Sequence, residues 1–289
     1  MKKLPFYTHG GFFHADEVTA YAICEMAGMS NKFVRLDNIN EIPGDGIVAD
    51  IGREYDPGQL RFDHHQGFIC RENGRPYASA GMLWKHYGHL VSAVYALSKW
   101  AQKIRDRVDE TLVQGIDAHD ADNAYQVVAT CSAGPVRSVT ISHIIAGFNS
   151  RNVKDKAAQD FCFRKAVDMV QAVIISHVEA AEVYMEACEK FEQVVNVQAN
   201  IITLSEGLPW KEIVHERHPE ALFVISPSNH PGNPWSMIAV PVDPESREVK
   251  RPIERPEWFA GFIHQGKWIA GGASPEELKR LAEWNIRHR

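Results

Sequence analysis

Residues 46–66 read GIVADIGREYDPGQLRFDHHQ, and this stretch decides the fold class. Two short apolar runs, residues 46–51 and 60–63, predict buried strands. Each run ends in polar side chains, with Asp50 after the first and the triplet Asp-His-His at residues 63–65 after the second. Two adjacent histidines after an aspartate at a strand end are hard to explain by packing. In parallel sheets ligands bind beyond the carboxyl ends of the strands, so these side chains mark a candidate site.

The flanking segments predict short strands that alternate with longer helices. Residues 4–8 form an apolar run that ends at His9, and a helix is expected to begin at about Asp16. Further helices are expected over residues 79–87 and 93–116, where apolar side chains recur at helical spacing. This alternation favours an α/β fold with a mainly parallel sheet in the first part of the chain.

The second half of the chain predicts a helical segment followed by a smaller α/β domain. Residues 153–193 contain neither Gly nor Pro and are almost uniformly helix-forming. Strand-like runs then alternate with Pro, Gly and Asn turns, and a final helix begins with Ser274 as its cap and Pro275 at its first position. The expected parts are a first domain at residues 1–150, a helical connector at 151–197 and a smaller domain at 198–289.

Composition excludes several classes of protein. The 37 acidic and 31 basic side chains give a net charge of −6, which argues against coating long nucleic acids by charge alone. No apolar run approaches the roughly 18 residues of a membrane span, and no signal-peptide-like stretch follows the first residues. The five cysteines are scattered and form neither a disulfide framework nor a CxxC metal motif. We therefore expect a soluble, cytoplasmic protein with no membrane partner.

Histidine is unusually frequent, with 14 residues, and its clusters with aspartate offer metal ligands. Taken alone, the cluster around His9 also fits a solvated surface turn, and Asp50 also fits a turn cap. Together the donors exceed what one catalytic ion takes from protein, and they fit two divalent ions bridged by one carboxylate, for which Asp50 is the candidate. Imidazole and carboxylate donors without thiolate suit Mn²⁺, Mg²⁺, Co²⁺ or Fe²⁺ better than a structural Zn²⁺. The candidate ligands are His9, His14, Asp16, Asp50, His64 and one of Asp117 and Asp120.

The triplet at residues 63–65 also supplies the candidate catalytic side chains. Neighbouring side chains of a strand point to opposite faces, so His64 is expected to bind metal while His65 faces the substrate. His65 would contact a phosphate or donate a proton. Asp63 is expected to orient the strand end and its histidine.

The order of these motifs resembles the DHH phosphoesterase superfamily. More closely, the sequence is similar to the family labelled "metal-dependent protein hydrolase", whose eukaryotic members include the melanocyte proliferating gene exonuclease. The similar segments are THGGFFHADEVTA (8–20), DIGREYDPGQLRFDHHQ (50–66), SAGMLWKHYG (79–88), PWKEIVHE (209–216) and GKWIAGGA (266–273). By this resemblance His9 with Asp16 corresponds to the first superfamily motif, Asp50 to the second, residues 63–65 to the signature triplet and Asp117 to the fourth. The first domain is then a DHH-type catalytic domain.

The resemblance also implies that the smaller domain binds substrate. A basic cluster over residues 247–255 could hold a phosphate, for which arginine is a bidentate partner, or form a solvated loop. In the superfamily, glycines of the second domain contact the substrate backbone, although two glycines alone indicate only a tight turn. The candidate substrate contacts are Arg251, Arg255, His264, Gly271 and Gly272.

The function implied by the resemblance is that of a metal-dependent hydrolase. We expect a two-metal phosphodiesterase, a 3′–5′ exonuclease on single-stranded RNA or short oligonucleotides, with Mn²⁺ as the first choice of ion. One alternative is a phosphatase or pyrophosphatase for a small phosphorylated anion. Another is a non-catalytic, metal-bearing protein that binds RNA or a partner, against which the complete ligand set argues. A homo-oligomer is compatible with the sequence.

Overall fold

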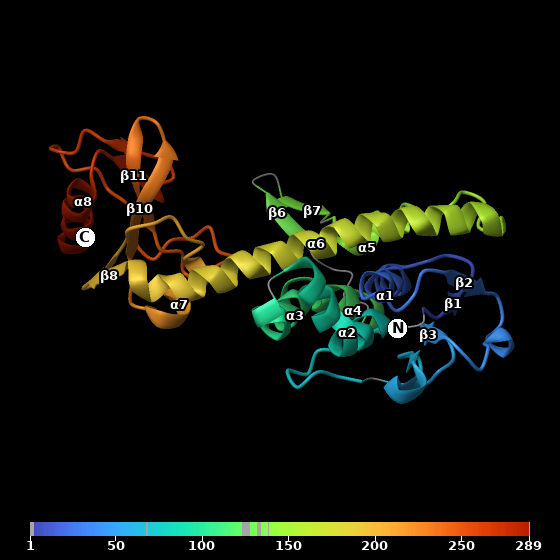
Figure 1. Ribbon diagram of the computed structural model, residues 1–289. Helices are drawn as coiled ribbons and strands as arrows, with labels where there is room; N and C mark the ends of the chain where they lie inside the picture. The colour runs from blue at the N-terminus through green and yellow to red at the C-terminus, as the bar shows by residue number, and fades with distance from the viewer. Residues whose placement is uncertain are drawn as a thin grey trace. The chain divides into compact units, whose positions relative to one another are not determined.

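The computed structural model describes residues 3–67, 69–96, 98–122, 128–131, 134–137 and 139–288. The chain divides into two units, Met1–Glu182 and Val183–Arg289 (Figure 1). The boundary lies inside the long helix α6, Lys156–Val194, which contributes residues to both units. None of the helices in the described ranges combines the length and apolarity needed to cross a membrane.

The first unit is built on a five-stranded sheet with the order β2-β1-β3-β5-β4. All neighbours from β2 to β5 run parallel, and only the short edge strand β4 is antiparallel to its neighbour. The strands are β1 Phe6–His9, β2 Phe33–Leu36, β3 Ile47–Ala49, β4 Tyr55–Asp56 and β5 Arg61–Phe62. The expected mainly parallel sheet is confirmed. The carboxyl ends of β1, β3 and β5 bring His9, Asp50 and Asp63 to one edge, as the sequence predicts.

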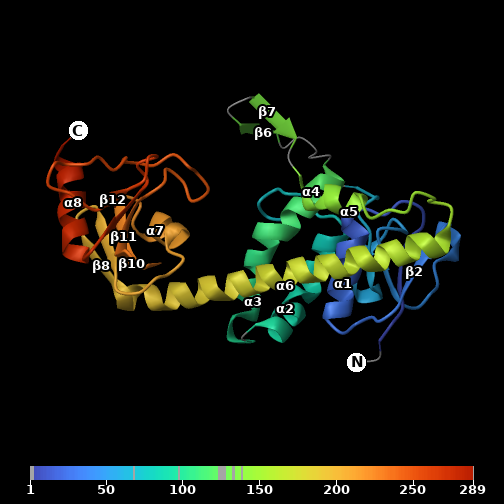
Figure 2. The same ribbon diagram turned by 90° about the horizontal axis from the view of Figure 1, so that it is seen from above.

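Several helices lie beside this sheet (Figures 1 and 2). The helical elements are α1 Ala15–Met26, the short turns η1 Ile39–Glu41, η2 Pro57–Gln59 and η3 Ser98–Trp100, α2 Ser79–Tyr95, α3 Ala101–Val108, the π-helical turn η4 Asp109–Val113, α4 Gln114–Ala121 and α5 Ile141–Ala146. A small hairpin, β6 Val128–Cys131 and β7 Gly134–Arg137, lies between α4 and α5 in the chain.

The boundaries of the second and third expected helices were wrong. Helix α2 continues through Gly88 to Tyr95, and the expected helix over residues 93–116 begins only at Ala101 and contains η4. A side chain at position 88 would come within 2.6 Å of Trp84 and 3.0 Å of Arg105, so Gly88 allows α3 to approach α2 closely. The Trp84 indole N–H donates to the Arg105 carbonyl across the same contact, at 2.9 Å. Gly88 therefore allows α2 and α3 to pack closely and does not end α2.

The amino terminus of α2 is held by carboxylates from two other helices. Its cap residue Ala78 provides no side-chain hydrogen bond. Instead, Asp16 of α1 accepts from the backbone N–H groups of Ser79 and Ala80, and Asp117 of α4 accepts from that of Gly81. Free N–H groups and the helix dipole favour negative charge at this end of a helix. The beginning of α2 therefore fixes α1 and α4 relative to each other behind the sheet edge.

The first part of α6 packs on the first unit through aromatic side chains. Phe163 lies 5.5 Å from Phe13, 4.7 Å from Phe33 and 6.2 Å from Tyr21 between ring centroids. Arg164 donates to Glu25 of α1 beside this cluster. Phe13 belongs to the loop between His9 and α1. Its contact with Phe163 therefore holds that loop against α6.

The second unit contains a six-stranded, mostly antiparallel sheet with the order β12-β13-β11-β10-β9-β8. Only β9 and β10 run parallel. Its elements are β8 Val195–Gln198, β9 Ile201–Leu204, α7 Lys211–Arg217, β10 Phe223–His230, β11 Asn233–Ala239, β12 Phe262–Ile263, β13 Ile269–Gly272 and α8 Pro275–Arg287. Its α/β character was predicted correctly.

Two apolar clusters cover the two faces of this second sheet. One joins Phe223 and Met237 to Leu278 and Leu281 of α8, and the other contains Phe191 at the end of α6. The Ser274 hydroxyl accepts from the Glu277 backbone N–H and Pro275 occupies the first helical position, which confirms the predicted cap of the last helix.

We expect a Gly81→Ala substitution to destabilise the first unit by about 3 kcal/mol, as overpacking of a rigid interior does. The new methyl group would overlap the Asp117 carboxylate and lie 2.8 Å from the Arg71 guanidinium. Urea unfolding measures the change. The control is Gly115→Ala in α4, where no atom lies within 4 Å, and it should leave stability equal or raise it by up to about 1 kcal/mol. Equal effects of the two substitutions would contradict this account of the α2 terminus.

Candidate metal centre and active-site cavity

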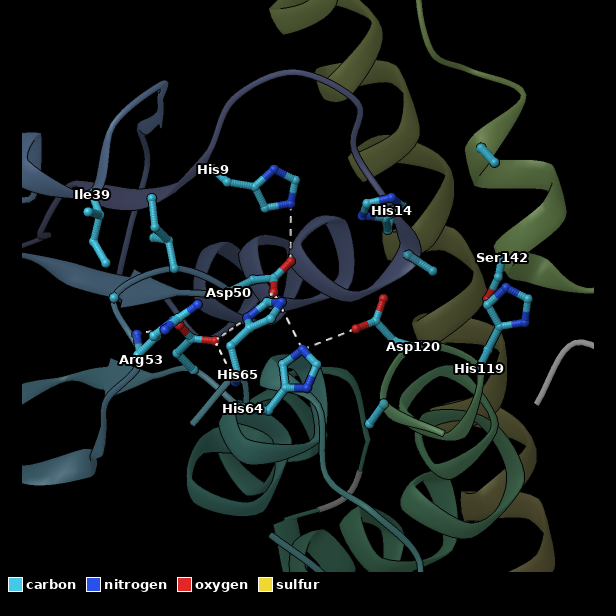
Figure 3. Close-up of a pocket in the computed structure, with 16 residues that line it drawn as sticks. His9, His14, Ile39, Asp50, Arg53, His64, His65, His119, Asp120 and Ser142 are labelled. Atoms are coloured by element: carbon cyan, nitrogen blue, oxygen red, sulfur yellow. Dashed lines mark hydrogen bonds and ion pairs between the residues drawn. The ribbon is translucent and has the colours of Figure 1, made fainter. Parts of the chain in front are cut away.

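A cavity of about 740 Å³ opens at the carboxyl edge of the parallel sheet (Figure 3). Its walls come from the loops after β1, β3 and β5 and from helices α4 and α5. The polar lining residues are His9, His14, Asp50, Arg53, Asp63, His64, His65, His119, Asp120 and Ser142. The sequence predicted six of these as ligands or catalytic groups through their positions after strands or at the start of α1, and predicted Asp120 as one of two alternatives.

Asp50 occupies the middle of this cavity. Its Oδ2 lies 3.2 Å from His9 Nε2, and its Oδ1 lies 3.5 Å from His64 Nε2 and 3.6 Å from His65 Nδ1. The side chain is almost completely buried, and its backbone has the left-handed φ of 56°. Non-glycine residues adopt this conformation at a cost of about 1–3 kcal/mol, and such strain concentrates at functional sites. The turn directs one carboxylate toward both histidine-bearing loops.

The first donor group lies around His9. Its Nε2 is 3.0 Å from Glu17 Oε1 as well as close to Asp50, and His14 stands beside it with 5.7 Å between ring centroids. His9 Nδ1 lies 2.8 Å from the Gly10 carbonyl. Donation to that carbonyl places the ring proton on Nδ1 and leaves Nε2 as the ligand atom.

The second donor group lies around His64. Its Nε2 is 3.1 Å from Asp120 Oδ2, 3.5 Å from Asp50 Oδ1 and 3.9 Å from Asp16 Oδ2. The Asp16 carboxylate thus lies near His64 and also accepts the backbone N–H groups at the start of α2. Asp50 belongs to both donor groups and also to a third set with Asp63, His64 and His65. In each set all candidate ligand atoms lie within 4.8 Å of one another.

Asp120, and not Asp117, reaches the cavity. Asp117 is fully buried, and its carboxylate accepts from Arg71 Nη2 at 2.6 Å and from the Gly81 N–H at 3.0 Å. Asp120 lies one turn later on α4, where its side chain is 21% exposed and faces His64. Of the two candidates left open by the sequence, the geometry favours Asp120 as the ligand. The role of Asp117 is then to anchor α4.

The expectation that His64 and His65 face opposite sides was wrong. Their ring centroids are 4.5 Å apart and both rings line the cavity. Strand β5 ends at Phe62, so the alternation of strand side chains no longer applies to the two histidines. Asp63 holds the second ring, because its Oδ1 lies 2.7 Å from His65 Nδ1 and also accepts the His65 backbone N–H.

Glu17 is a site residue that the sequence did not single out as a ligand. It is fully buried, contacts His9 and accepts the backbone N–H of His14 at 3.0 Å, which is the reciprocal bond of a capping box. An acidic residue in a first helical turn is usually explained by the helix dipole alone. In the sequence, the only indication of a role for Glu17 in the site is its position three residues after His14.

The electrostatics of the cavity favour positive charge. Burial alone would lower the pKa of His9, but hydrogen bonds to Asp50 and Glu17 raise it to about 11. Burial also opposes protonation of His64, yet its contacts with Asp120 and Asp50 raise its pKa to about 11. For Asp50, burial acts to raise the pKa, and the two histidines outweigh this effect and hold it well below its usual range. The carboxylates around His9 and His64 thus favour positive charge at this edge of the sheet.

The donor set fits divalent ions. Glu17 Oε2, Asp50 Oδ1 and His64 Nε2 are three of the ten buried side-chain atoms that lack a hydrogen-bond partner among the described residues. Unpaired buried polar atoms are costly, and a bound cation would satisfy these three. All three belong to the donor groups around Asp50, and the donors are oxygen and imidazole nitrogen. This chemistry suits Mn²⁺, Mg²⁺ or Co²⁺.

The predicted arginine contacts of the second unit are tied to backbone carbonyls. Arg251 Nη1 donates to Asn285 at 3.3 Å, and Arg255 Nη1 donates to Phe259 at 2.8 Å and to Gly261 at 3.0 Å. These bonds orient both guanidinium groups. Their part in substrate binding stays a prediction.

The other three predicted contacts of this unit differ in their surroundings. His264 accepts the Gly266 N–H and packs against Trp268. Gly271 borders a pocket of about 200 Å³. A side chain at Gly272 would lie 3.0 Å from Leu278, so that glycine allows α8 to pack on the sheet.

Comparison with known proteins gives matches over nearly the whole chain. The family model MYG1_exonuc, described as "Uncharacterised protein family (UPF0160)", matches residues 6–284. The human MYG1 exonuclease is 26% identical and the alignment covers 98% of this chain and 85% of the human protein. A MYG1 protein of Saccharomyces cerevisiae is also 26% identical, with coverage of 96% and 94%. A solved pGpG-specific phosphodiesterase from Vibrio is 16% identical over 99% of this chain and 98% of that one, with a TM-score of 0.29.

We expect the protein to bind two Mn²⁺ ions, and Asp120→Asn to bind one, because Asp120 belongs to the second donor group. Asp117→Asn should keep both ions but lose about 3–5 kcal/mol of stability, since it breaks a buried ion pair with Arg71. Metal content after dialysis and urea unfolding measure the two effects. The exposed Glu245→Gln is the control for both. Loss of an ion in Asp117→Asn with both retained in Asp120→Asn would reverse the assignment.

Proposed function

Because the chain belongs to the MYG1 exonuclease family, we propose that it is a two-metal phosphodiesterase that removes nucleotides from the 3′ end of RNA or of short oligonucleotides. We also propose that it belongs to the DHH phosphoesterase superfamily. The observation that supports the proposal most is the position of Asp50, whose carboxylate is shared by two donor groups at one sheet edge. A carboxylate shared by two ions is the arrangement of two-metal hydrolases that attack phosphate esters.

The proposed ligands divide into two sets. His9, His14, Glu17 and Asp50 would hold one ion, and Asp16, Asp50, His64 and Asp120 the other. Divalent ions held there supply Lewis-acid polarisation of the phosphoryl group and an activated water at neutral pH. The backbone bonds of Asp16 to the start of α2 keep its carboxylate in place before any ion binds. The site is therefore largely preorganised by the protein.

His65 and Asp63 are proposed to act on the substrate side. Asp63 is buried and holds His65 at Nδ1, so the other ring nitrogen, Nε2, is left for a phosphate oxygen or a proton transfer. The hydrogen bond to Asp63 is the largest cause that raises the pKa of His65. A protonated imidazole there can donate to a developing negative charge, which is the role of a general acid.

The lining of the cavity favours a phosphodiester over pyrophosphate. Among the described lining residues there is one Arg and no Lys, so the protein offers few cationic contacts apart from the proposed ions. The walls also offer apolar surface from Ala15, Ile39 and Ile51 that a base or sugar can contact. Net charge −6 further favours substrates of which only a few phosphates are bound at once.

The proposal is tested with 5′-labelled and 3′-labelled single-stranded RNA of 5 to 20 nucleotides in Mn²⁺. We expect stepwise shortening from the 3′ end, and at least a 100-fold lower rate in Asp50→Asn, which excludes a contaminating nuclease. Pyrophosphate and nucleoside triphosphates are tested in parallel. Rapid hydrolysis of pyrophosphate without cleavage of RNA would instead support the phosphatase alternative. No hydrolysis of any substrate by metal-loaded protein would favour a binding protein.

We expect His65→Ala to lower the turnover number by about 10²–10³-fold while both ions stay bound, because its Nδ1 is committed to Asp63. His64→Ala should lower both turnover and metal content, since its Nε2 faces Asp50 and Asp120. Steady-state kinetics and metal analysis on the same preparations separate the two effects. The control is His177→Ala on α6, outside the cavity. Equal loss of metal in the two cavity variants would show that both histidines are ligands.

A further inference from the structure

Arg53 is the only arginine or lysine among the described residues that line the metal cavity. Its side chain is exposed, and within the described ranges no hydrogen bond or ion pair of its guanidinium is found. In Figure 3 it lies on the wall formed with His65 and Ile39, across from Asp120, Ser142 and His119. A free guanidinium thus faces a cavity whose other charged groups are carboxylates and histidines.

The backbone at Arg53 is strained. Its φ is 56°, a left-handed value that glycine adopts without cost, and Gly52 before it has φ 110°. A glycine at position 53 would therefore be favoured for the turn alone. The presence of a long charged side chain at this position calls for a purpose beyond the geometry of the turn.

The Asp63 carboxylate holds this strained residue. Its Oδ2 accepts the Arg53 backbone N–H at 2.6 Å, while its Oδ1 holds His65 at 2.7 Å. One buried carboxylate therefore fixes the two residues that present donors to the same wall. A guanidinium offers parallel N–H groups that match two oxygens of one phosphate, and charge-assisted bonds of this kind are strong.

We propose that Arg53 binds a phosphate group of the substrate and so sets the affinity of the cavity for nucleotides. This inference rests on the proposed phosphodiesterase function. The phosphate is either the scissile group at the metal centre or its neighbour along the chain. In both cases the contact is made by Arg53 and supported by Asp63, and it acts on binding more than on the chemical step.

The test uses metal-loaded protein and two variants at position 53. Arg53→Gln keeps side-chain length and removes charge, and Arg53→Gly keeps the turn and removes its strain. Both should weaken binding of 5′-AMP, measured by calorimetry, by about 10–100-fold. Added salt should weaken AMP binding less in each variant than in the wild type, because a salt-screened attraction between the guanidinium and the phosphate is lost. Metal content should stay unchanged, and Arg53→Gly should melt at an equal or higher temperature.

The controls match the two changes separately. Ala199→Gly relieves a left-handed residue in the second unit, with φ 51°, and Arg151→Gln removes an exposed arginine outside the cavity. Neither should alter AMP affinity or its salt dependence. Wild-type affinity and salt dependence in Arg53→Gln would overturn the inference. AMP binding tests Arg53 even if no oligonucleotide is cleaved, so failure of the proposed function is seen separately.

Kinetics on two dinucleotides then locate the phosphate. One has a 5′-phosphate besides its internal phosphodiester, and the other has only the phosphodiester. If Arg53 binds the scissile group, Arg53→Gln raises KM for both by a similar factor. If it binds the neighbouring group, KM rises only for the phosphorylated dinucleotide. An unchanged KM for both would contradict any phosphate contact, and loss of turnover alone with unchanged KM would identify a different role.

Discussion

The need to compensate buried carboxylates organises the first unit. Asp16, Glu17, Asp50, Asp63 and Asp117 are all buried near the carboxyl edge of one sheet. Such charges are tolerated only when they are paired or hydrogen-bonded. Backbone N–H groups of α2 and Arg71 compensate Asp117, and Arg53 N–H and His65 compensate Asp63. For Asp50 and Glu17 the nearest partners are histidines with raised pKa values, and Asp50 Oδ1 and Glu17 Oε2 have no hydrogen-bond partner among the described residues.

The same constraint explains why two aspartates on one short helix differ. Arg71 binds Asp109 through two bonds and Asp117 through a third, so it fixes α4 to the loop that follows residues 63–65. With Asp117 fixed to α2, the turn that follows brings Asp120 to His64. Burial raises the pKa of Asp117 to about 7, although the neighbouring Arg71 favours the ionised form. The buried position therefore disfavours an ionised carboxylate. Asp117, which anchors α4, and Asp120, the proposed ligand, thus lie one helical turn apart.

The sequence predicted the strand ends and the donors that follow them, because short apolar runs and polar clusters are local features. His9, Asp50 and His64 meet at one edge for the reason that parallel strands end together. What it could not predict depends on contacts between distant segments. The position of Asp120 beside His64 follows from the contacts of Asp117 with Arg71 and Gly81. The shared direction of His64 and His65 follows from the end of β5 at Phe62, and the continuation of α2 through Gly88 follows from the approach of α3.

Strain in the turn after β3 connects the fold to the chemistry. A strand that ended in an ordinary turn would place the carboxylate of residue 50 on one face only, whereas the left-handed Asp50 lies between two histidine-bearing loops. Glycine would adopt both strained positions of this turn without cost, but it would supply neither the central carboxylate nor the guanidinium. The cost of roughly 1–3 kcal/mol per residue is offset by the bonds of Asp63 and by the packing of β3 against β1 and β5. Side-chain chemistry, and not backbone preference, therefore accounts for the residues in this turn.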